Sequence, residues 1–351
     1  MPDRTSENGG AVYVQTNDAT KNEIVVYRRS ADGALAPLGR EATGGKGTGE
    51  PHLPSQSSVA LSDNGQWLLV ANTGSDDLSL LGVEAEGLSL ADRVPSGGRA
   101  PTSVAVHGRV VYALNTGAEG SAPNITGFTI GDGKLTSLEG STRPLSADDA
   151  DPAQISFSPD GKTLVVTERG TNSISAYSVD EGGYAEGPTT IESSGATPYG
   201  FDFIGKEALV VTEAFGGAVG AAAASSYALA EPARLTPISG SIGDTRSEVC
   251  WAATTKDGRY VYVTNFGDGT ISSYTISGDG ALELLEPVAG STRLGQAGIR
   301  DEALTPDGRY LYAIDADAQK VYGWTVQQDG RLAPVGEFEG VPETVAGIAA
   351  S

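Results

Sequence analysis

The sequence has few of the residues that cross-link chains or bind metals. One cysteine in 351 residues excludes an internal disulfide, and two histidines with that cysteine are too few for the usual zinc sites. The run from Ser146 to Asp151 offers three carboxylates to calcium, but it lacks EF-hand spacing, so a solvated acidic loop is the favoured interpretation. No phosphate-binding loop, GxSxG or HExxH motif occurs. The sequence therefore predicts no metal and no cofactor.

Basic residues are also scarce. The 23 Lys and Arg face 45 Asp and Glu, which gives a net charge of −22. Nucleic acids and anionic membranes bind basic patches, so neither is an expected partner. No apolar run reaches the length of a membrane span, and residues 1–9 are polar, with no signal-peptide core. We expect a cytoplasmic protein with a flexible tail at residues 1–9; the pattern predicts no oligomeric state.

Against this background a segment recurs seven times. Its fullest copy is FSPDGKTLVVTERGTNSISAYSV, residues 157–179. An Asp-Gly turn precedes an alternating apolar run, a polar loop and a second alternating run. The turn glycines are spaced by 55, 43, 53, 44, 53 and 50 residues, from Gly10 through Gly65, Gly108, Gly161, Gly205 and Gly258 to Gly308. Repeats of about 40–50 residues that are rich in strand signals are typical of propeller blades.

Each copy predicts the strands of one blade. The two-residue alternation and the β-branched or aromatic residues favour pleated strands, and Asp-Gly favours tight turns between them. In the fullest copy we expect strands at 155–157, 164–167 and 173–177; a fourth follows a second turn, as at 282–285. The Ala-rich stretch 218–224 is interpreted as a distorted loop. The sequence thus predicts an all-β, seven-bladed β-propeller with four-stranded blades, one domain over residues 1–351.

The ends of the chain predict how the ring closes. The N-terminus supplies two strands of a blade but no innermost strand. Residues 341–349 resemble the innermost strands expected at 101–106 and 152–157. We therefore expect the C-terminal segment to pair with residues 11–16, which removes open sheet edges.

A site is expected at one mouth of the central channel, because the segments entering the innermost strands and the loops after the second strands meet there. The residues entering the innermost strands include His52, Gln56, Thr102, Gln154, Tyr199, Cys250, Trp251, Arg300, Asp301 and Glu343. The second strands end at Asn17, Asn72, Asn115, Glu168, Glu213, Asn265 and Asp315.

Two of these positions depart from the common pattern. Asn and Asp cap turns readily, whereas Glu168 and Glu213 are poorer cappers. Each Glu is therefore either a turn cap or a functional group, such as a general base or an acceptor for a substrate hydroxyl.

Other residues at the mouth also have two interpretations. His52 is either an ordinary loop histidine or a proton shuttle. Cys250 has no histidine partner in the pattern and is favoured as a structural residue over a nucleophile. Trp251 either packs between blades or forms a pocket wall. Arg300 and Asp301 are adjacent, so one should face the channel, where Arg300 would hold a carboxylate or join a rim ion pair.

The repeat resembles the seven-bladed lactonase family, which includes propeller-type 6-phosphogluconolactonases and carboxymuconate-lactonising enzymes. The segments that carry the resemblance are SPDGKTLVVTE (158–168), LLVAN (68–72), DGRYLY (307–312) and DGAL (279–282). It covers about residues 12–349, and it is strongest to a bacterial branch of the family.

The resemblance implies hydrolysis of a small lactone, or the reverse ring closure, with the lactone or its acid as the ligand. Glu213 matches a Glu that ends the second strand in family members. Two basic elements are absent: Tyr199-Gly200 stands where Arg-His is common, and Asn265-Phe266-Gly267 stands where Asn-Arg-Gly is common. Arg169, Arg300 and His52 are possible replacements.

Our functional hypothesis is therefore a lactonase-like enzyme. Opening a lactone needs a base to activate water and donors to hold the oxyanion. The predicted catalytic residues are Glu213, Glu168 and His52, and the predicted substrate-binding residues are Gln56, Gln154, Tyr199, Trp251, Arg300 and Asp301. The alternative is a non-catalytic propeller that binds a small molecule or a protein, which a plugged channel would favour.

Overall fold

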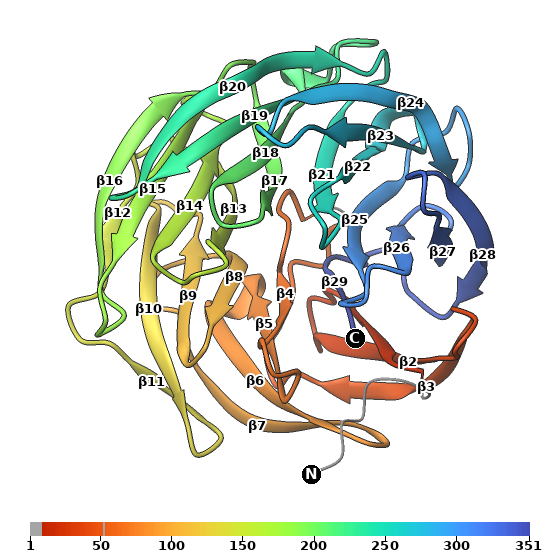
Figure 1. Cartoon of the computed structure of the whole chain (residues 1–351). Helices are drawn as coiled ribbons and strands as arrows, with labels where there is room; N and C mark the ends of the chain where they lie inside the picture. The colour runs from red at the N-terminus through yellow and green to blue at the C-terminus, as the bar shows by residue number, and fades with distance from the viewer. Residues whose placement is uncertain (1–8, 52) are drawn as a thin grey trace.

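The computed structural model describes residues 9–51 and 53–351, which form seven antiparallel sheets around a central axis (Figure 1). Numbering the sheets as blades along the chain, blade 1 holds β29 (Ile348–Ala350), β1 (Ala11–Gln15), β2 (Glu23–Arg29) and β3 (Leu35–Ala42). Blade 2 holds β4 (Val59–Leu61), β5 (Trp67–Asn72), β6 (Asp77–Glu84) and β7 (Gly87–Pro95). Blade 3 holds β8 (Pro101–His107), β9 (Val110–Asn115), β10 (Asn124–Gly131) and β11 (Lys134–Ser137), with β12 (Arg143–Pro144) also paired to β10.

The remaining blades have four strands each. Blade 4 holds β13 (Pro152–Phe157), β14 (Thr163–Glu168), β15 (Ser173–Val179) and β16 (Ala185–Glu192). Blade 5 holds β17 (Pro198–Ile204), β18 (Ala208–Glu213), β19 (Ala223–Ala230) and β20 (Arg234–Gly243). Blade 6 holds β21 (Val249–Thr254), β22 (Tyr260–Asn265), β23 (Thr270–Ile276) and β24 (Leu282–Ser291). Blade 7 holds β25 (Ile299–Leu304), β26 (Tyr310–Asp315), β27 (Lys320–Val326) and β28 (Leu332–Glu339).

The predicted propeller is confirmed. The described helices are three 3₁₀ turns, η1 (Thr73–Ser75), η2 (Phe215–Gly217) and η3 (Phe266–Asp268), and none of them has the length of a membrane span. The Ala-rich stretch is loop as far as residue 222, and β19 then begins.

The core lies between blades, and strand alternation explains it. Along β14, Leu164 and Val166 pack with residues of blade 3, whereas Val165, between them, packs with residues of blade 5. Successive side chains of a strand point to opposite faces, and here each face meets a neighbouring blade. This explains why the side chains on both faces of a second strand are apolar.

Tyrosines of the repeat also join neighbouring blades. A tyrosine on the second strand donates its hydroxyl hydrogen to a glycine carbonyl in the outer turn of the next blade. Three such bonds are Tyr112 to Gly183 (2.8 Å), Tyr262 to Gly330 (2.8 Å) and Tyr312 to Gly33 (2.6 Å). All three glycines have φ between 82° and 86°, which favours glycine in these turns. The last of these bonds joins blade 7 to blade 1.

The C-terminal strand closes the ring, as predicted. β29 pairs with β1 through Val12 with Ala350, Tyr13 with Ala349 and Val14 with Ile348. The strand is shorter than the sequence predicts, because residues 341–347 form a connecting loop. At Gly347, a Cβ would lie 2.3 Å from the Ser58 hydroxyl, so the chain enters the blade through a space only glycine fits.

The segment before β4, Leu53–Ser58, crosses the central channel, and Figure 1 shows this coil extending from β4 toward β21. The Gln56 side chain donates to the Ala252 carbonyl (2.9 Å) and accepts from the Ala252 amide (3.2 Å), so blade 2 is joined to blade 6. The Trp251 indole donates to the Ser55 carbonyl (3.0 Å). We call Leu53–Ser58 the crossing segment.

The crossing segment is also held by other blades. The Ser55 hydroxyl donates to the Thr102 carbonyl of blade 3 (2.7 Å), and the Gln56 amide donates to the Ala153 carbonyl of blade 4 (3.2 Å). The Ser57 amide donates to the Asp301 carboxylate of blade 7 (3.3 Å). These hydrogen bonds satisfy polar groups that would otherwise be buried without partners.

Gly200 leaves room for this segment. A Cβ at residue 200 would lie 2.4 Å from the Gln56 Oε1 and 2.6 Å from the Cys250 carbonyl oxygen. We predict that Gly200→Ala lowers the free energy of unfolding by about 1–3 kcal/mol, the usual cost of overpacking. Gly39→Ala on β3 is the matched control, because nothing lies within 4 Å of its added Cβ. Thermal melting measures both, and equal midpoints would contradict this account.

Candidate functional site

A cavity of about 380 Å³ lies at the mouth of the channel where the innermost strands begin. Its residues come from the entries to the innermost strands of blades 5, 6 and 7 and from the loops after the second strands of blades 4, 5 and 6. We call it the mouth cavity; the described residues that line it are Arg169, Thr197, Tyr199, Ala214, Gly216, Gly217, Glu248, Cys250, Phe266 and Arg300.

A repeated backbone feature shapes this mouth. Asp151, Thr197 and Glu248 each directly precede an innermost strand and have φ of 45°, 58° and 55°. Their carbonyls accept hydrogen bonds from the amides of Arg169, Ala214 and Phe266, at 3.1, 3.0 and 2.9 Å. The loop after the second strand is therefore tied to the entry of the innermost strand. Left-handed φ is unusual for Thr and Glu, and such residues concentrate at functional sites.

Tyr199 stands between an aromatic wall and a cation. Its ring meets Trp251 edge to face, with centroids 5.7 Å apart. The Arg169 guanidinium lies 4.9 Å from the ring centroid, donates to the Tyr199 hydroxyl (3.2 Å) and pairs with Asp151 (2.6 Å). Burial raises the pKa of Tyr199, while the Arg169 and Arg300 charges oppose that rise. The phenol is therefore a neutral hydrogen-bond donor.

Arg300 brings a second guanidinium to the cavity. Its Cζ lies 4.0 Å from the centroid of the Phe266 ring, and the residue is 7% exposed. Burial lowers the pKa of Arg300, yet an arginine remains charged in proteins. Burial also raises the pKa of Cys250 to about 12, against the effects of the same two arginines. Both positive charges thus act on one small volume.

The sequence matches a known family over most of its length. Residues 6–142, 122–214 and 211–345 match the model described as Lactonase, 7-bladed beta-propeller. The chain belongs to this family. No curated protein matches the sequence.

Solved structures agree with the family's fold. A Bacteroides fragilis protein provisionally named 6-phosphogluconolactonase is 18% identical, with 100% of both chains covered and a TM-score of 0.74. A Lactobacillus plantarum protein is 17% identical, over 98% of this chain and 99% of that one, with a TM-score of 0.76. The periplasmic gluconolactonase of Pseudomonas aeruginosa is 16% identical, over 97% and 98%, with a TM-score of 0.71. At these identities the likeness shows the fold alone.

In this lactonase-family chain, Glu213 is enclosed by its own blade and the connection before it. It is fully buried and accepts hydrogen bonds from the Ser225 and Ser241 hydroxyls (2.6 Å each), the Gly195 amide (2.8 Å) and the Ser193 hydroxyl (3.3 Å). This arrangement supports a structural role, because every contact fastens a loop or an outer strand to β18. Its catalytic role stays a prediction.

Glu168 is enclosed in the same way. It is fully buried and accepts from the Ser146 amide (3.2 Å), the Ser146 hydroxyl and the Thr171 hydroxyl (3.0 Å). Ser146 belongs to the acidic run 146–151, and the described residues include no group of three acidic, His or Cys side chains that could hold a metal ion. The catalytic role of Glu168 likewise stays a prediction.

The predicted binding residues divide into two groups. Tyr199 and Arg300 line the mouth cavity, with Trp251 behind Tyr199. Gln56 and Gln154 instead line the opposite end of the channel, where both bridge backbones: Gln154 donates to the Phe201 carbonyl (2.9 Å) and accepts from its amide (2.7 Å). Asp301 binds the crossing segment. His52 lies outside the described residues.

Glu248 was missed by the sequence reasoning, although it directly precedes an innermost strand. It is half-buried. Two glycines give this carboxylate its space, because a Cβ at Gly217 would lie 2.7 Å from its Oε1 and one at Gly267 would lie 3.1 Å from its Oε2. Glu248 lines the mouth cavity with Arg169, Arg300 and Tyr199, and an ionised carboxylate there can accept a proton from water.

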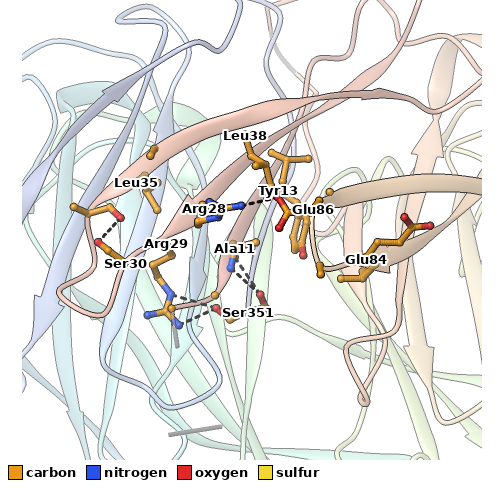
Figure 2. A pocket seen from close by; sticks show the side chains of 18 residues that line it. Ala11, Tyr13, Arg28, Arg29, Ser30, Leu35, Leu38, Glu84, Glu86 and Ser351 are labelled. Atoms are coloured by element: carbon orange, nitrogen blue, oxygen red, sulfur yellow. Dashed lines mark hydrogen bonds and ion pairs between the residues drawn. The ribbon is translucent and has the colours of Figure 1, made fainter. Parts of the chain in front are cut away.

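A larger cavity of about 730 Å³ lies away from the channel, between blades 1 and 2 (Figure 2). Its arginines already have partners: Arg28 reaches Glu86 (2.9 Å), and Arg29 donates to the Ser351 carbonyl (3.0 Å). Tyr13, Leu35 and Leu38 also line it. We assign no chemistry to this cavity.

The buried thiol gives a direct test of the mouth. With a pKa of about 12, Cys250 is protonated at neutral pH, and its Sγ–H donates to the Glu248 carbonyl (3.4 Å). A thiol reacts as its thiolate. We predict that a disulfide reagent leaves the folded protein unlabelled at about pH 8 and labels one thiol per chain in denaturant. Rapid labelling of the folded protein would contradict the burial described here.

Proposed function

We propose that this protein hydrolyses a small lactone bearing an anionic group, or forms that lactone from its acid, in the mouth cavity. The supporting observation is that Arg169 and Arg300, from blades 4 and 7, line one cavity with Tyr199 and Glu248. Two guanidiniums favour a carboxylate or phosphate on the substrate. Family membership supports lactone chemistry, and the neighbouring gluconolactonase and 6-phosphogluconolactonase names are consistent with a sugar-acid ring.

In the hydrolytic direction, Glu248 accepts a proton from water as the water oxygen attacks the lactone carbonyl carbon. The carbonyl oxygen then carries negative charge, which the Tyr199 hydroxyl or a guanidinium stabilises. The ring C–O bond breaks and the leaving alkoxide takes the proton that Glu248 had accepted, which gives the hydroxy acid and returns Glu248 to its ionised form. The family resemblance points to Glu213 as the base. The residues that line the mouth cavity point to Glu248 instead.

Paired substitutions separate these two carboxylates. We predict that Glu248→Gln lowers kcat/KM by about 10²–10⁴-fold, the usual contribution of a general base, and leaves thermal melting unchanged. Glu213→Gln should instead lower the melting temperature, because an amide nitrogen would face hydroxyl groups that now donate to a carboxylate. A pH-indicator assay with neutral and anionic lactones measures activity.

The two contradicting results differ. Full activity of Glu248→Gln, with a folded but inactive Glu213→Gln, would return the base to Glu213 and leave the lactonase proposal standing. If the wild-type protein hydrolyses no lactone in the panel and forms none from the acids, the enzymatic proposal fails.

The anionic substrate has its own test. We predict that Arg169→Ala raises KM for an anionic lactone by about tenfold or more, since a charged hydrogen bond is worth about 1.5–3 kcal/mol, and that it changes KM for a neutral lactone much less. Arg259→Ala is the matched control, because Arg259 is exposed in the Asp-Gly turn of blade 6 at the opposite face and pairs with Asp257. Equal effects on both lactones would contradict anion recognition.

A non-catalytic propeller that binds a small anion is the second candidate. The crossing segment favours it, because the channel does not run open through the ring. Hydroxy acids would then bind at the mouth cavity with the same dependence on Arg169, and calorimetry would detect that binding where no lactone turns over.

A further inference from the structure

A second cavity, of about 510 Å³, occupies the end of the channel opposite the mouth. It is lined where the innermost strands end, and Gln56 and Ser57 of the crossing segment line it too. Its described charged residues are Asp202, Lys256 and Glu302. We call it the lower cavity. The mouth chemistry proposed above uses none of these groups.

Glu302 has an unusual environment in the lower cavity. The residue is 3% exposed, and both carboxylate oxygens are buried without a hydrogen-bond donor among the described residues. The Thr254 hydroxyl oxygen, which lines the same cavity, is also buried and unpartnered. Buried polar atoms nearly always have partners, and leaving one without a partner costs about 1–3 kcal/mol. Two residues that line one cavity thus carry buried oxygens without partners: the Glu302 carboxylate lacks donors, and the Thr254 hydroxyl lacks both a donor and an acceptor.

The neighbouring acids do not supply donors. Asp202 accepts from the amides of Phe203 (2.8 Å) and Thr254 (2.7 Å), and Asp301 accepts from the amides of Glu302 (2.9 Å) and Ser57 (3.3 Å). Burial raises the pKa of Glu302 well above its ordinary value, and the charges of Asp301 and Asp202 raise it further. Lys256, in the turn after β21, lines the cavity and is exposed. A positive donor would satisfy Glu302.

We propose that the lower cavity binds a small molecule through its primary ammonium group, held by Glu302 and Thr254. An ammonium has three N–H donors and no acceptor, which matches two carboxylate oxygens and one hydroxyl. A metal ion fits less well, because no described group of three acidic, His or Cys side chains could hold one. The net charge of −22 attracts cations to the protein, and the cavity volume suits a molecule rather than a bare ion.

Calorimetry at about pH 8 and low salt tests this, with n-butylammonium as the probe. We expect millimolar binding or tighter, and tetramethylammonium, which has the same charge but no N–H, should bind at least about tenfold more weakly. Glu302→Gln should weaken n-butylammonium at least about tenfold, and Thr254→Val should weaken it by a smaller factor. Glu283→Gln, an exposed carboxylate on β24, is the matched control and should leave binding unchanged.

Glu302→Gln is close in shape to the native residue, and thermal melting checks that it folds. The Lys256 ammonium itself could occupy the site and compete with the probe, and Lys256→Met removes that competitor. Tighter n-butylammonium binding by this variant supports the site. Equal binding by the wild type and Glu302→Gln, or no binding by the wild type, overturns the proposal. Binding of Ca²⁺ that needs Glu302, without binding of n-butylammonium, also overturns it. Lactone turnover is measured separately, so failure here leaves the proposed function untouched.

Discussion

Ring closure is the constraint on which the rest of the structure depends. Every blade packs both faces of its strands against neighbours, so an open ring would expose two apolar faces and break the tyrosine bond between blades 7 and 1. β29 prevents this by pairing with β1, and the seam is then packed like the others, with Val12, Val14 and Tyr312 buried. The Tyr312 bond to the Gly33 carbonyl repeats across the seam the contact that Tyr112 and Tyr262 make elsewhere. Closure therefore holds blades 1 and 7 together by the interactions that hold the other pairs.

A closed ring also fixes where chemistry is possible. The second strands are buried on both sides. The polar residues that end them, such as Asn72, Glu213 and Asp315, are also fully buried and form hydrogen bonds with neighbouring segments. Freedom remains at the entries to the innermost strands, where a side chain can turn into the channel without weakening a blade. Tyr199, Glu248 and Arg300 all lie at such entries.

The sequence predicted the fold well, because each blade is specified locally. The Asp-Gly turns, the two-residue alternation and the strand-like C-terminus are local signals, and the ring follows from their repetition. The position of Tyr199 and Arg300 at the mouth followed from the same register. The hydrogen bonds that enclose Glu213 could not be predicted in this way. Their donors Ser193, Ser225 and Ser241 come from three segments that side-chain packing brings together. The path of the crossing segment could not be predicted from the sequence either. Gln56 binds the backbone of Ala252, 196 residues away, and every residue type has the same backbone groups.

The crossing segment gives the channel two ends of opposite character. The mouth cavity has two guanidiniums and one carboxylate, with Asp151 paired to Arg169 at its edge, in a chain with 22 more acidic than basic residues. The lower cavity has the unpartnered Glu302 and, close by, Asp202 and Asp301. Interactions between buried charges weaken little with salt, so the two proposals, an anion at the mouth and a cation in the lower cavity, are compatible in one molecule. Gln56 and Asp301 hold the segment between them by neutral and charge-assisted hydrogen bonds. The segment contacts the two ends differently: Gln56 and Ser57 line the lower cavity, whereas the mouth is reached through Trp251, which donates to the Ser55 carbonyl and packs against Tyr199.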